Sequence, residues 1–370
     1  MEPKTKKILI IVLIVFIVVA VILGLTLGLV FGLKKKDKNK DEEVEIVNSY
    51  DNTEELIQKF PVNNPTTVQD GIEKKIQNRL LTGFENWNRG FDAWKKWGDI
   101  LYTNASIYNV HGARLTLAQY QQSMDITLKK TNILMGDFHN MLICGNFTAI
   151  FYDIKTIVGE REVPGTVMEF VVFKDYGEEL GTRVVVGWGG SKDSSFDSMR
   201  SFQGDEERMI QDEQIHLLLN YQIPTSGTLR QRYPILYPSE YLDTVKSDKF
   251  VDIIMEGFDK WNVELNAPND YKDWLSTTYD ADALIYGFDG KKDGLTLPKY
   301  KEAIDELAQK KTIKKLYFDN ILIRDDWAAL HYRYRSIDKQ TNAIYVGDTM
   351  QFLKFKEVGN TYKIVGSWIK

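Results

Sequence analysis

The chain has 370 residues, of which 43% are hydrophobic and 12% aromatic, so it exceeds one average domain and holds enough apolar side chains for two folded cores. This composition excludes a largely disordered protein. Residues 1–40 carry eight lysines against two acidic residues, a net charge of +6, which leaves −11 for the remainder because the whole chain carries −5. An acidic remainder argues against nucleic acid as a partner.

Residues 8–33 predict a transmembrane helix behind a short N-terminal tail, residues 1–7. The 26 residues between Lys7 and Lys34 carry no charge, and at about 1.5 Å each they exceed the ~30 Å thickness of a hydrocarbon core. A cleaved signal peptide is the alternative, but its apolar region is usually only about 7 to 15 residues long and ends at a small-residue cleavage site. We therefore expect a single-pass membrane protein whose membrane partner is reached through residues 8–33.

The side of the membrane on which the folded part lies stays open. Three lysines precede the apolar segment and five follow it, which weakly favours the cytoplasm for the folded part. Two N-glycosylation triplets, at Asn104 and Asn146, would be used only in a lumenal or extracellular domain. Such triplets also arise by chance in a chain rich in asparagine.

Two further segments connect the folded parts. Residues 34–63 are polar and charged, which predicts a spacer that holds the folded part away from the bilayer, with one short helix near residues 54–60. Residues 194–236 form a long connecting segment with a helix expected over residues 205–221. A connection of this length is expected to pack on the domains that it joins.

The remaining residues contain a duplicated domain. Five passages recur in the same order, at an offset that drifts only between 174 and 182 positions. They are GFENWN and GFDKWN, starting at 83 and 257; LTLAQY and LTLPKY, at 115 and 295; FHNMLICGNFTAIFYDI and FDNILIRDDWAALHYRY, at 138 and 318; GTVMEFVVFK and GDTMQFLKFK, at 165 and 347; and VVVGW and KIVGSW, at 184 and 363. A repeat of about 130 residues is too long for a solenoid unit, so two complete domains are expected, at 64–193 and 237–370.

Within each copy the pattern predicts helices followed by strands. The first copy opens with apolar residues at helical spacing, which indicate an amphipathic helix. These residues are Ile72, Ile76, Leu80, Phe84 and Trp87. A short strand follows, then a second helix that begins near Thr116 or Thr296, and then four strands rich in β-branched and aromatic residues. The fold class expected is α+β, with two tandem cone-shaped, curved antiparallel sheets, each wrapped around its N-terminal helices.

This order of elements resembles the SnoaL-like branch of the nuclear transport factor 2-like superfamily. The resemblance rests on the LTLxxY passages, on the strands FTAIFYDI and WAALHYRY, and on the closing passages TRVVVGW and NTYKIVGSW. It covers both copies and implies a cone-shaped sheet around an apolar cavity. Members of this superfamily include polyketide cyclases, ketosteroid isomerases and dehydratases as well as noncatalytic binding or dimerising modules, so the fold alone does not choose a function.

The tyrosines and asparagines that both copies keep are the candidates for ligand binding. They are Tyr108, Asn140 and Tyr152 in the first copy and Tyr286, Asn320 and Tyr332 in the second. Such side chains can orient a ligand through hydrogen bonds, but neither type is poised to move protons at neutral pH. Core packing is the competing interpretation of the same residues.

Catalytic members of the resembled family are expected to use an Asp or a His–Asp pair at inward strand positions as general acid and base. If Tyr152 and Tyr332 face the cavity, alternation places Asp153, His331 and Arg333 on the outer face. The reverse facing would bring His331 and Arg333 into the second cavity. His331, Tyr332 and Arg333 are therefore the catalytic candidates.

We expect no cofactor and no metal site. The aspartate-rich stretch 280–294 lacks the spacing of a calcium loop, and the single Cys144 excludes an intrachain disulfide. The main expectation is a membrane-anchored module that binds a small apolar ligand or serves as a scaffold without established catalysis. The alternatives are an isomerase, cyclase or dehydratase that works in the second copy, and an interaction platform in which the two copies pair within the chain as a pseudo-dimer.

Overall fold

The computed structural model describes residues 46–47, 53–110, 113–128, 132–177, 181–191, 218–263, 269–288 and 293–370. The transmembrane helix expected at residues 8–33 lies outside the described residues, as does nearly all of the helix expected at 205–221. Among the helices within the described ranges, none combines the length and the hydropathy that crossing a bilayer requires.

The described chain is α+β and contains two mixed sheets. The first half, residues 53–191, has a seven-stranded sheet in the order β1-β4-β5-β6-β7-β2-β3. Its strands are β1 (Val62–Asn64), β2 (Tyr102–Val110), β3 (Ala113–Thr116), β4 (Asn132–Cys144), β5 (Phe147–Val158), β6 (Arg161–Asp175) and β7 (Thr182–Ser191). Its helices are α2 (Thr53–Lys59), α3 (Ile72–Asn88), α4 (Phe91–Leu101) and α5 (Leu117–Leu128).

The second half, residues 218–370, has a six-stranded sheet in the order β10-β11-β12-β13-β8-β9. Its strands are β8 (Tyr279–Tyr286), β9 (Leu295–Thr296), β10 (Lys311–Arg324), β11 (Trp327–Asp338), β12 (Ile344–Val358) and β13 (Thr361–Ile369). Its helices are α9 (Leu229–Arg232), α10 (Thr244–Val263), α11 (Asn269–Thr278) and α12 (Leu297–Lys310). The sequence of elements from α10 to β13 thus repeats that from α3 to β7.

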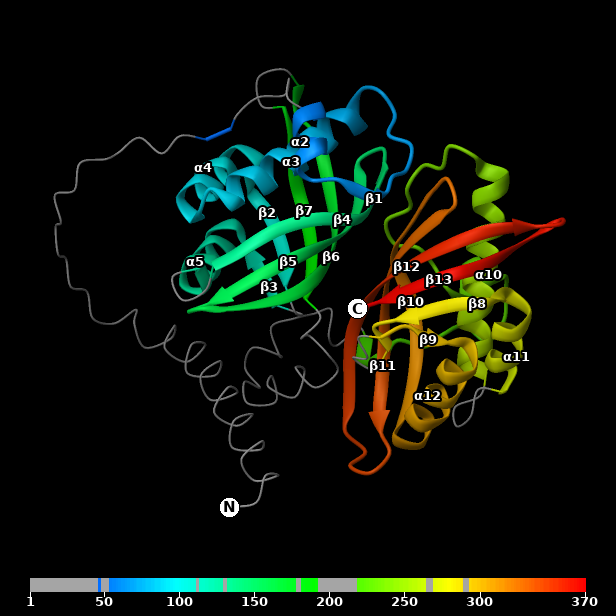
Figure 1. The fold of residues 1–370 in the computed structure, drawn as a ribbon. Coiled ribbons are helices and arrows are strands. Elements are labelled where there is room, and N and C mark those ends of the chain that lie inside the picture. Colours follow the sequence, from blue (N-terminus) through cyan, green and yellow to red (C-terminus); the bar gives the residue numbers. More distant parts are fainter. Residues whose placement is uncertain are drawn as a thin grey trace, which may run out of the picture.

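The two sheets lie next to each other in the middle of the molecule (Figure 1). Helices α3 to α5 cover the side of the first sheet away from the second, and helices α10 to α12 cover the side of the second sheet away from the first. We call the face that a sheet turns to its own helices the inner face, and the opposite face the outer face. The two outer faces therefore meet between the halves.

Both sheets are mixed, which corrects the expectation of antiparallel sheets. Strand β2 runs parallel to β7, β8 runs parallel to β13, and β1 runs parallel to β4. Strands β2 and β8 each follow two helices, and a chain that reaches a sheet through helices rather than through a hairpin is free to lie parallel to its neighbour. The four long strands of each copy were predictable, but the direction of these three pairings was not.

The repeated Trp-Asn pair fastens the long helix of the first half to strand β4. The indole Nε1 of Trp87 donates a hydrogen bond to the carbonyl of Ile133 at 2.6 Å. The side chain of Asn88 accepts from the N–H of Met135 at 2.7 Å and donates to the carbonyl of Met135 at 2.9 Å. These bonds satisfy backbone groups at a place where the pairing of β4 with β5 shifts register.

The second half repeats this fastening on strand β10. Trp261 Nε1 donates to the carbonyl of Ile313 at 2.9 Å, and Asn262 bonds the N–H and the carbonyl of Lys315 at 2.9 and 2.7 Å. The register of β10 with β11 also shifts directly after Lys315. The passages GFENWN and GFDKWN are thus kept because both bulged strands need the same backbone partners.

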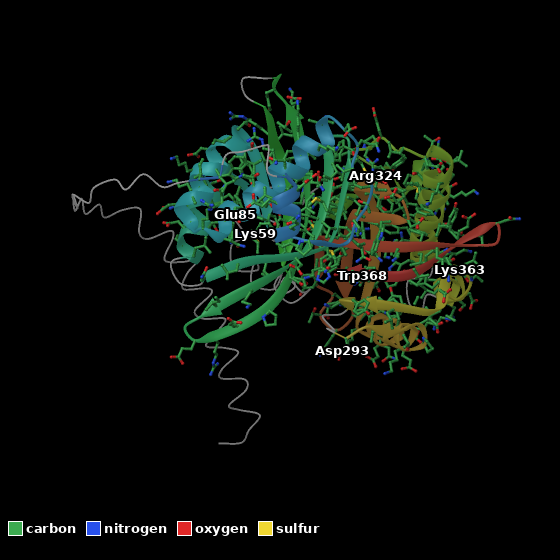
Figure 2. The ribbon with its side chains drawn as sticks, turned by 45° about the horizontal axis from the view of Figure 1, so that its top comes forward. Lys59, Glu85, Asp293, Arg324, Lys363 and Trp368 are labelled. Carbon is green, nitrogen blue, oxygen red and sulfur yellow. The ribbon has the colours of Figure 1, made fainter. Side chains whose placement is uncertain are left out.

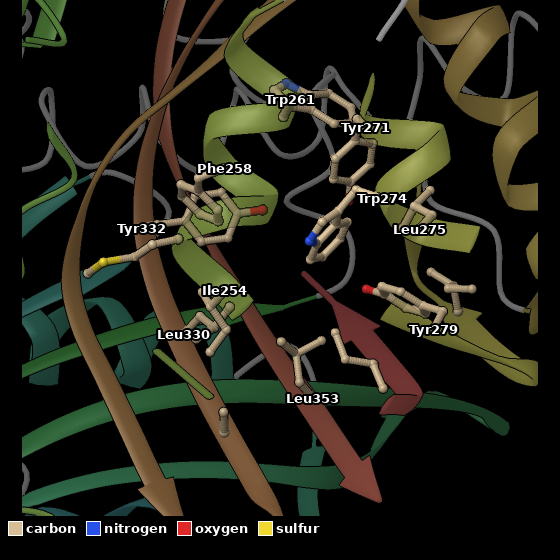
Figure 3. Packing of buried hydrophobic residues seen from close by; sticks show 14 of the residues in the cluster. Ile254, Phe258, Trp261, Tyr271, Trp274, Leu275, Tyr279, Leu330, Tyr332 and Leu353 are labelled. Carbon is tan, nitrogen blue, oxygen red and sulfur yellow. The ribbon is translucent and has the colours of Figure 1, made fainter. Parts of the chain in front are cut away.

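Each half has its own apolar core on the inner face of its sheet. In the first half, the ring of Phe84 packs against Phe138 and Tyr152, with centroids 4.6 and 4.7 Å apart. In the second half, Phe258 makes the matching contact with Tyr332, at 4.8 Å. Figure 3 shows part of this second core, with Phe258 beside Tyr332 and further aromatic residues of helices α10 and α11 along one side.

A third apolar cluster lies between the halves and contains side chains from both outer faces. Its buried members are Leu142, Cys144, Ala149, Phe151, Met168, Phe170 and Trp188 from the first half and Leu322, Trp327, Ala329, Met350 and Phe352 from the second. Phe151 and Phe352 meet across the junction, with ring centroids 5.8 Å apart. Burial of such side chains from water is the main source of free energy that holds the two sheets together.

A buried ion pair also crosses the junction. Arg324, at the end of β10, donates to Glu73 Oε1 at 2.6 Å and to the carbonyl of Ile143. Both charged side chains are almost fully buried, and Glu73 additionally accepts from the N–H of Gly145. Figure 2 shows Arg324 at the place where the strands of the two halves come together.

Candidate functional site

Glu169 of strand β6 lies inside the first half, where two tyrosines donate hydrogen bonds to its carboxyl group. Tyr152 Oη donates to Glu169 Oε1 at 2.6 Å, and Tyr108 Oη donates to Glu169 Oε2. The ring of Tyr120 stacks on that of Tyr108, with centroids 4.4 Å apart and an interplanar angle of 11°. We call Glu169, Tyr108, Tyr120 and Tyr152 the Glu169 cluster. It brings one carboxyl and three phenols together in an aromatic interior.

The surroundings change the acidity of these groups. Burial raises the pKa of Glu169, and the hydrogen bonds from Tyr108 and Tyr152 only partly oppose this shift. Burial, followed by the charge of Glu169, raises the pKa of both tyrosines well above the usual range. The phenols therefore remain donors at neutral pH, whereas the carboxyl is closer to exchanging a proton than a solvated glutamate is. Glu169 as a whole residue is half-buried.

The alternation of strand β6 directs Glu169 inward. Its neighbours at every second position, Val171 and Phe173, belong to the core of the first half, whereas Met168 and Phe170 belong to the cluster between the halves. Because side chains alternate along a strand, a carboxyl between Val167 and Val171 must point into the core.

Two glycines of β7 make room for the ring of Tyr108. A Cβ atom at Gly187 would lie 2.4 Å from Tyr108 Cε2, and one at Gly189 would lie 3.2 Å from Tyr108 Cε1. Real Cβ atoms do not come as close as the first of these distances. The glycines at 187 and 189, near the end of VVVGW and directly after it, are therefore explained by a close approach between β7 and a ring of the cluster.

The tyrosines predicted to bind a ligand are divided by the structure. Tyr108 and Tyr152 both lie in the interior of the first half, and Tyr332 lies in the interior of the second. Tyr286 instead stacks on Trp368, with centroids 5.6 Å apart and an interplanar angle of 7°.

A shift of one residue in register separates Tyr286 from Tyr108. In the first half, Tyr108 of β2 is paired with Gly187 of β7. In the second half, the residue equivalent to Gly187 is Ser367 of β13, and it is paired with Ile285 of β8. Ile285 accordingly lies in the core of the second half, and Tyr286 faces away from it. A shift by one residue exchanges the two faces of a strand, so the expected equivalence of Tyr108 and Tyr286 was wrong for the side-chain direction.

The two asparagines predicted to bind a ligand instead donate side-chain hydrogen bonds to backbone carbonyl groups. Asn140 donates to the carbonyl of Asn64 in β1 at 3.2 Å, and Asn320 donates to the carbonyl of Tyr237 at 2.8 Å. Each is 1% exposed. In the first half the segment that Asn140 bonds is β1, which pairs with β4, and in the second half it is the segment around Ile235, which bridges to β10. Both asparagines thus attach to the sheet the part of the chain that precedes the long helix.

The three catalytic candidates of the second half do not form one site. Tyr332 is on the inner face, whereas His331 is completely buried on the outer face against the first half. The imidazole lies 5.4 Å from the ring of Phe170 and 5.3 Å from that of Trp188. Arg333 bonds Asp319 at 2.5 Å on the same outer face.

His331 joins a charged network at the junction. Its Nε2 lies 2.7 Å from Asp348 Oδ2, and its Nδ1 lies 3.5 Å from Asp319 Oδ2. Burial disfavours the charged form of Asp348, yet the hydrogen bond with His331 and the charge of Arg333 hold its pKa below the usual range. This network lies on the outer face of the second sheet, where His331 also meets the rings of Phe170 and Trp188 of the first half.

The first half has a related pair at equivalent positions. His139 Nε2 lies 2.7 Å from Asp153 Oδ1, where the second half pairs Asp319 with Arg333. The same two positions thus carry an acid and a base in both halves, with their signs exchanged. The pair in the first half is partly exposed, at 34% and 46% for its two side chains.

Glu169 was not predicted from the sequence because it is not shared by the two copies. The second half has Gln351 at the equivalent position, and this residue bonds Ser367 Oγ at 2.8 Å. A usable signal was nevertheless present, since Glu169 is the one charged residue among the inward positions of VMEFVVF.

Within the described residues no group of three or more His, Cys, Asp or Glu side chains is arranged to hold a metal ion. Cys144 is buried, and burial raises the pKa of its thiol to about 11, so it is not a thiolate nucleophile at neutral pH.

No protein-family model and no curated protein matches the chain. Among solved structures, a nuclear transport factor 2-like protein from Anabaena variabilis matches with 15% identity over 35% of this chain and 94% of its own, at a TM-score of 0.29. A protein assigned as a SnoaL-like polyketide cyclase from Jannaschia sp. CCS1 matches with 13% identity over 36% and 94%, at 0.29. One assigned as a ketosteroid isomerase from Shewanella frigidimarina matches with 18% identity over 32% and 94%, at 0.26. Identities and TM-scores this low do not extend to a shared activity.

Proposed function

We propose that the first half of this chain binds a small, mostly apolar molecule through the Glu169 cluster, in a protein that residues 8–33 hold at a membrane. The observation that supports binding is the carboxyl of the half-buried Glu169 in an aromatic interior, where its hydrogen-bond donors among the described residues are two phenol hydroxyls. Glu169 has no ion-pair partner among the described residues. A buried carboxyl without a cation costs free energy, so folding alone does not account for it.

The chemistry of the cluster selects the kind of ligand. A flat apolar body can pack against the rings of Tyr108 and Tyr120, while a hydroxyl group at its end can donate to Glu169 or accept from Tyr152. Such a molecule would replace one tyrosine-to-carboxyl hydrogen bond by a bond of its own. Hydrogen bonds to a charged group contribute about 1.5 to 3 kcal/mol, enough to orient the ligand.

The raised pKa of Glu169 supports a second proposal, that the bound molecule undergoes proton transfer. A carboxyl with a raised pKa can remove a proton beside a carbonyl group, and a neighbouring phenol can donate to the resulting enolate oxygen. For the isomerase, cyclase or dehydratase alternative we therefore propose Glu169 in the first half as the catalytic group, instead of His331 and Arg333.

The proposal of membrane attachment rests on the composition of residues 8–33. An uncharged apolar run that ends on lysines at both sides is typical of a single-pass helix. A ligand with an apolar body partitions into lipid, so a binding site tethered near a bilayer would meet it at a raised local concentration.

Calorimetric titration of the full chain in lipid nanodiscs with 2-naphthol tests the binding proposal, with empty nanodiscs as the partition blank. We expect saturable binding that Glu169→Leu weakens by about tenfold or more, because the hydrogen bond to a charged acceptor is lost. Gln351→Leu is the matched control, since it changes the equivalent position of the second half. Equal affinities in wild type and Glu169→Leu would exclude the Glu169 cluster as the site.

The proton-transfer proposal has its own measurement. Hydrogen–deuterium exchange beside the carbonyl of 2-tetralone, followed by NMR, should be accelerated by the wild-type chain and not by Glu169→Gln. Gln keeps the shape of the side chain but cannot accept the proton. Binding without accelerated exchange would leave the binding proposal standing and reject catalysis.

A further inference from the structure

Lys315 of strand β10 places its amine among aromatic rings in the interior of the second half. Its Nζ atom lies 4.7 Å from the ring centroids of both Phe258 and Trp261. The rings of Tyr271 and Tyr332 follow at 5.4 and 5.5 Å. These rings come from helices α10 and α11 and from strand β11, so three elements converge on one amine. Figure 3 shows the four rings grouped on one side of the core.

The amine has no polar partner within the described part of the chain. The hydrogen bonds of Lys315 involve its backbone, which Asn262 holds from both the N–H and the carbonyl. No described carboxylate forms an ion pair with Nζ, although the side chain is only half-buried. An amine in an apolar setting without a counter-ion costs free energy, and the aromatic faces offset only part of that cost.

The fold does not require a lysine here. The equivalent residue of the first half is Met135, whose backbone is held by Asn88 in the same way. The same backbone arrangement therefore accepts a methionine side chain, and of the two halves only the second has an amine at this position.

The setting also changes the state of the amine. Burial lowers the pKa of Lys315 to about 7, so about half of the amine is neutral at neutral pH. A solvated lysine, with a pKa of about 10.4, is almost entirely charged at the same pH. A neutral amine is a nucleophile, and a lysine desolvated in an apolar pocket is one of the recognised ways to obtain it.

We propose that Lys315 is the amine of a second binding site, in the second half, which captures small apolar aldehydes or ketones as an imine. The nitrogen lone pair attacks the carbonyl carbon and forms a C–N bond. The two hydrogens of the neutral amine then leave with the carbonyl oxygen as water, and a C=N bond remains. No oxidant, reductant or cofactor takes part in this step.

The surrounding rings suit this chemistry. Phe258, Trp261, Tyr271 and Tyr332 can pack against the apolar body of the carbonyl compound while its carbon faces Nζ. The same apolar lining limits the access of water that would hydrolyse the imine. The site is separate from the Glu169 cluster, which lies in the interior of the other half, so the two proposals stand or fall independently.

Reductive trapping tests the inference. The full chain in lipid nanodiscs is incubated at pH 7 with 6-methoxy-2-naphthaldehyde and sodium cyanoborohydride, and labelled peptides are identified by mass spectrometry. We expect Lys315 to be labelled at least about tenfold faster than Lys314, its neighbour on the same strand, because a larger fraction of its amine is neutral. Lys315→Met should lose this adduct and Lys314→Met should keep it.

We expect Lys315→Met to fold, because the first half carries methionine at the equivalent position, Met135. Circular dichroism of the variant checks that its secondary structure is unchanged. Labelling of Lys315 at the rate of Lys314 would overturn the inference. A second result would also overturn it. If the wild-type chain formed no imine adduct but bound 2-naphthoate, and Lys315→Met lost that binding, the amine would serve only as a positive charge that binds anions.

Discussion

The interiors of the two halves share one frame but hold opposite chemistry. Where the first half has Glu169, the second has Gln351, and where the second half has Lys315, the first has Met135. At these two positions, therefore, the first half has an acid where the second has an amide, and the second half has a base where the first has a thioether. The comparison teaches that the residues kept between the copies fasten the backbone, while the chemistry lies in residues that differ.

The two halves pack against each other at the junction between their outer faces, and a variant there should have the largest effect on the free energy of unfolding. Arg324→Ala removes one partner of a nearly fully buried ion pair and leaves Glu73 uncompensated. We expect the free energy of unfolding to fall by about 3 to 5 kcal/mol, measured by urea denaturation. The exposed pair of Lys155 with Glu162 is the matched control, and Lys155→Ala should cost no more than about 1 kcal/mol.

A double variant sharpens this prediction. Glu73→Gln together with Arg324→Met removes both charges and should cost less than Arg324→Ala alone. If the double variant were the less stable of the two, the pair itself would stabilise the junction more than its desolvation costs.

The buried amine of the second half should give a stability that depends on pH. The folded pKa of Lys315 lies below its unfolded pKa, so the unfolded chain binds more protons between pH 7 and about 10. Lys315→Met should therefore raise the free energy of unfolding by up to about 4 kcal/mol near pH 6, and this gain should shrink as the pH rises towards 10.

The neighbouring titratable groups do not interfere in this range. The phenols that face Lys315, Tyr271 and Tyr332, have pKa values raised by burial and remain neutral throughout it. Parallel denaturation curves of wild type and Lys315→Met from pH 6 to 10 measure the effect. A difference that does not change with pH would show that Lys315 is not a desolvated amine.

The histidine pairs on the two outer faces offer the next comparison. The pKa of Asp348 is lowered in the folded state, so its contribution is present above the unfolded pKa of about 4 and is lost as the pH falls below that value. Asp348→Asn should reduce the free energy of unfolding by about 1.5 to 3 kcal/mol at pH 7 and by less at pH 3. Asp153→Asn, at the partly exposed pair of the first half, should cost less than about 1 kcal/mol. Equal costs in thermal denaturation at pH 7 would contradict the difference in burial.

Two glycines test how closely Tyr108 is held in the Glu169 cluster. Gly187→Ala would place a Cβ atom 2.4 Å from its ring, and Gly189→Ala would place one at 3.2 Å. We expect a loss of about 1 to 3 kcal/mol in stability for the first and less for the second, together with weaker binding of 2-naphthol in the first. The reverse order of the two variants would show that the ring lies elsewhere.

The smallest effect on stability is expected at Asn146. This residue is exposed in the turn between β4 and β5, so a glycan on its side chain would extend into solvent. If the folded part is lumenal, expression in a eukaryotic secretory pathway should yield a glycosylated chain that Asn146→Gln converts to a lighter form on gel electrophoresis. An unmodified chain would favour the cytoplasmic side.

Several features of the fold could be predicted from the sequence. Apolar spacing located the helix that begins at Ile72. Alternation put Tyr332 and His331 on opposite faces of their strand, and the family resemblance favoured Tyr152 and Tyr332 as the inward residues, which is how the structure has them. The candidate site was predicted less well. Tyr108 and Tyr152 were chosen correctly as inward residues, but Glu169 and Lys315 were overlooked because each occurs in only one copy.

The sequence by itself determined the repeat, the long opening helix of each copy and the four long strands that close it, because these depend on local periodicity and on identical residues. Only the tertiary structure decided which strands are parallel, which face Tyr286 takes, and that the outer faces of the two halves are packed together. These outcomes depend on register and on contacts between residues far apart in the chain, and a register change of one position reverses every side chain of a strand. The same distant contacts turn Glu169 and Lys315 from ordinary surface-type residues into ionisable groups held in aromatic interiors.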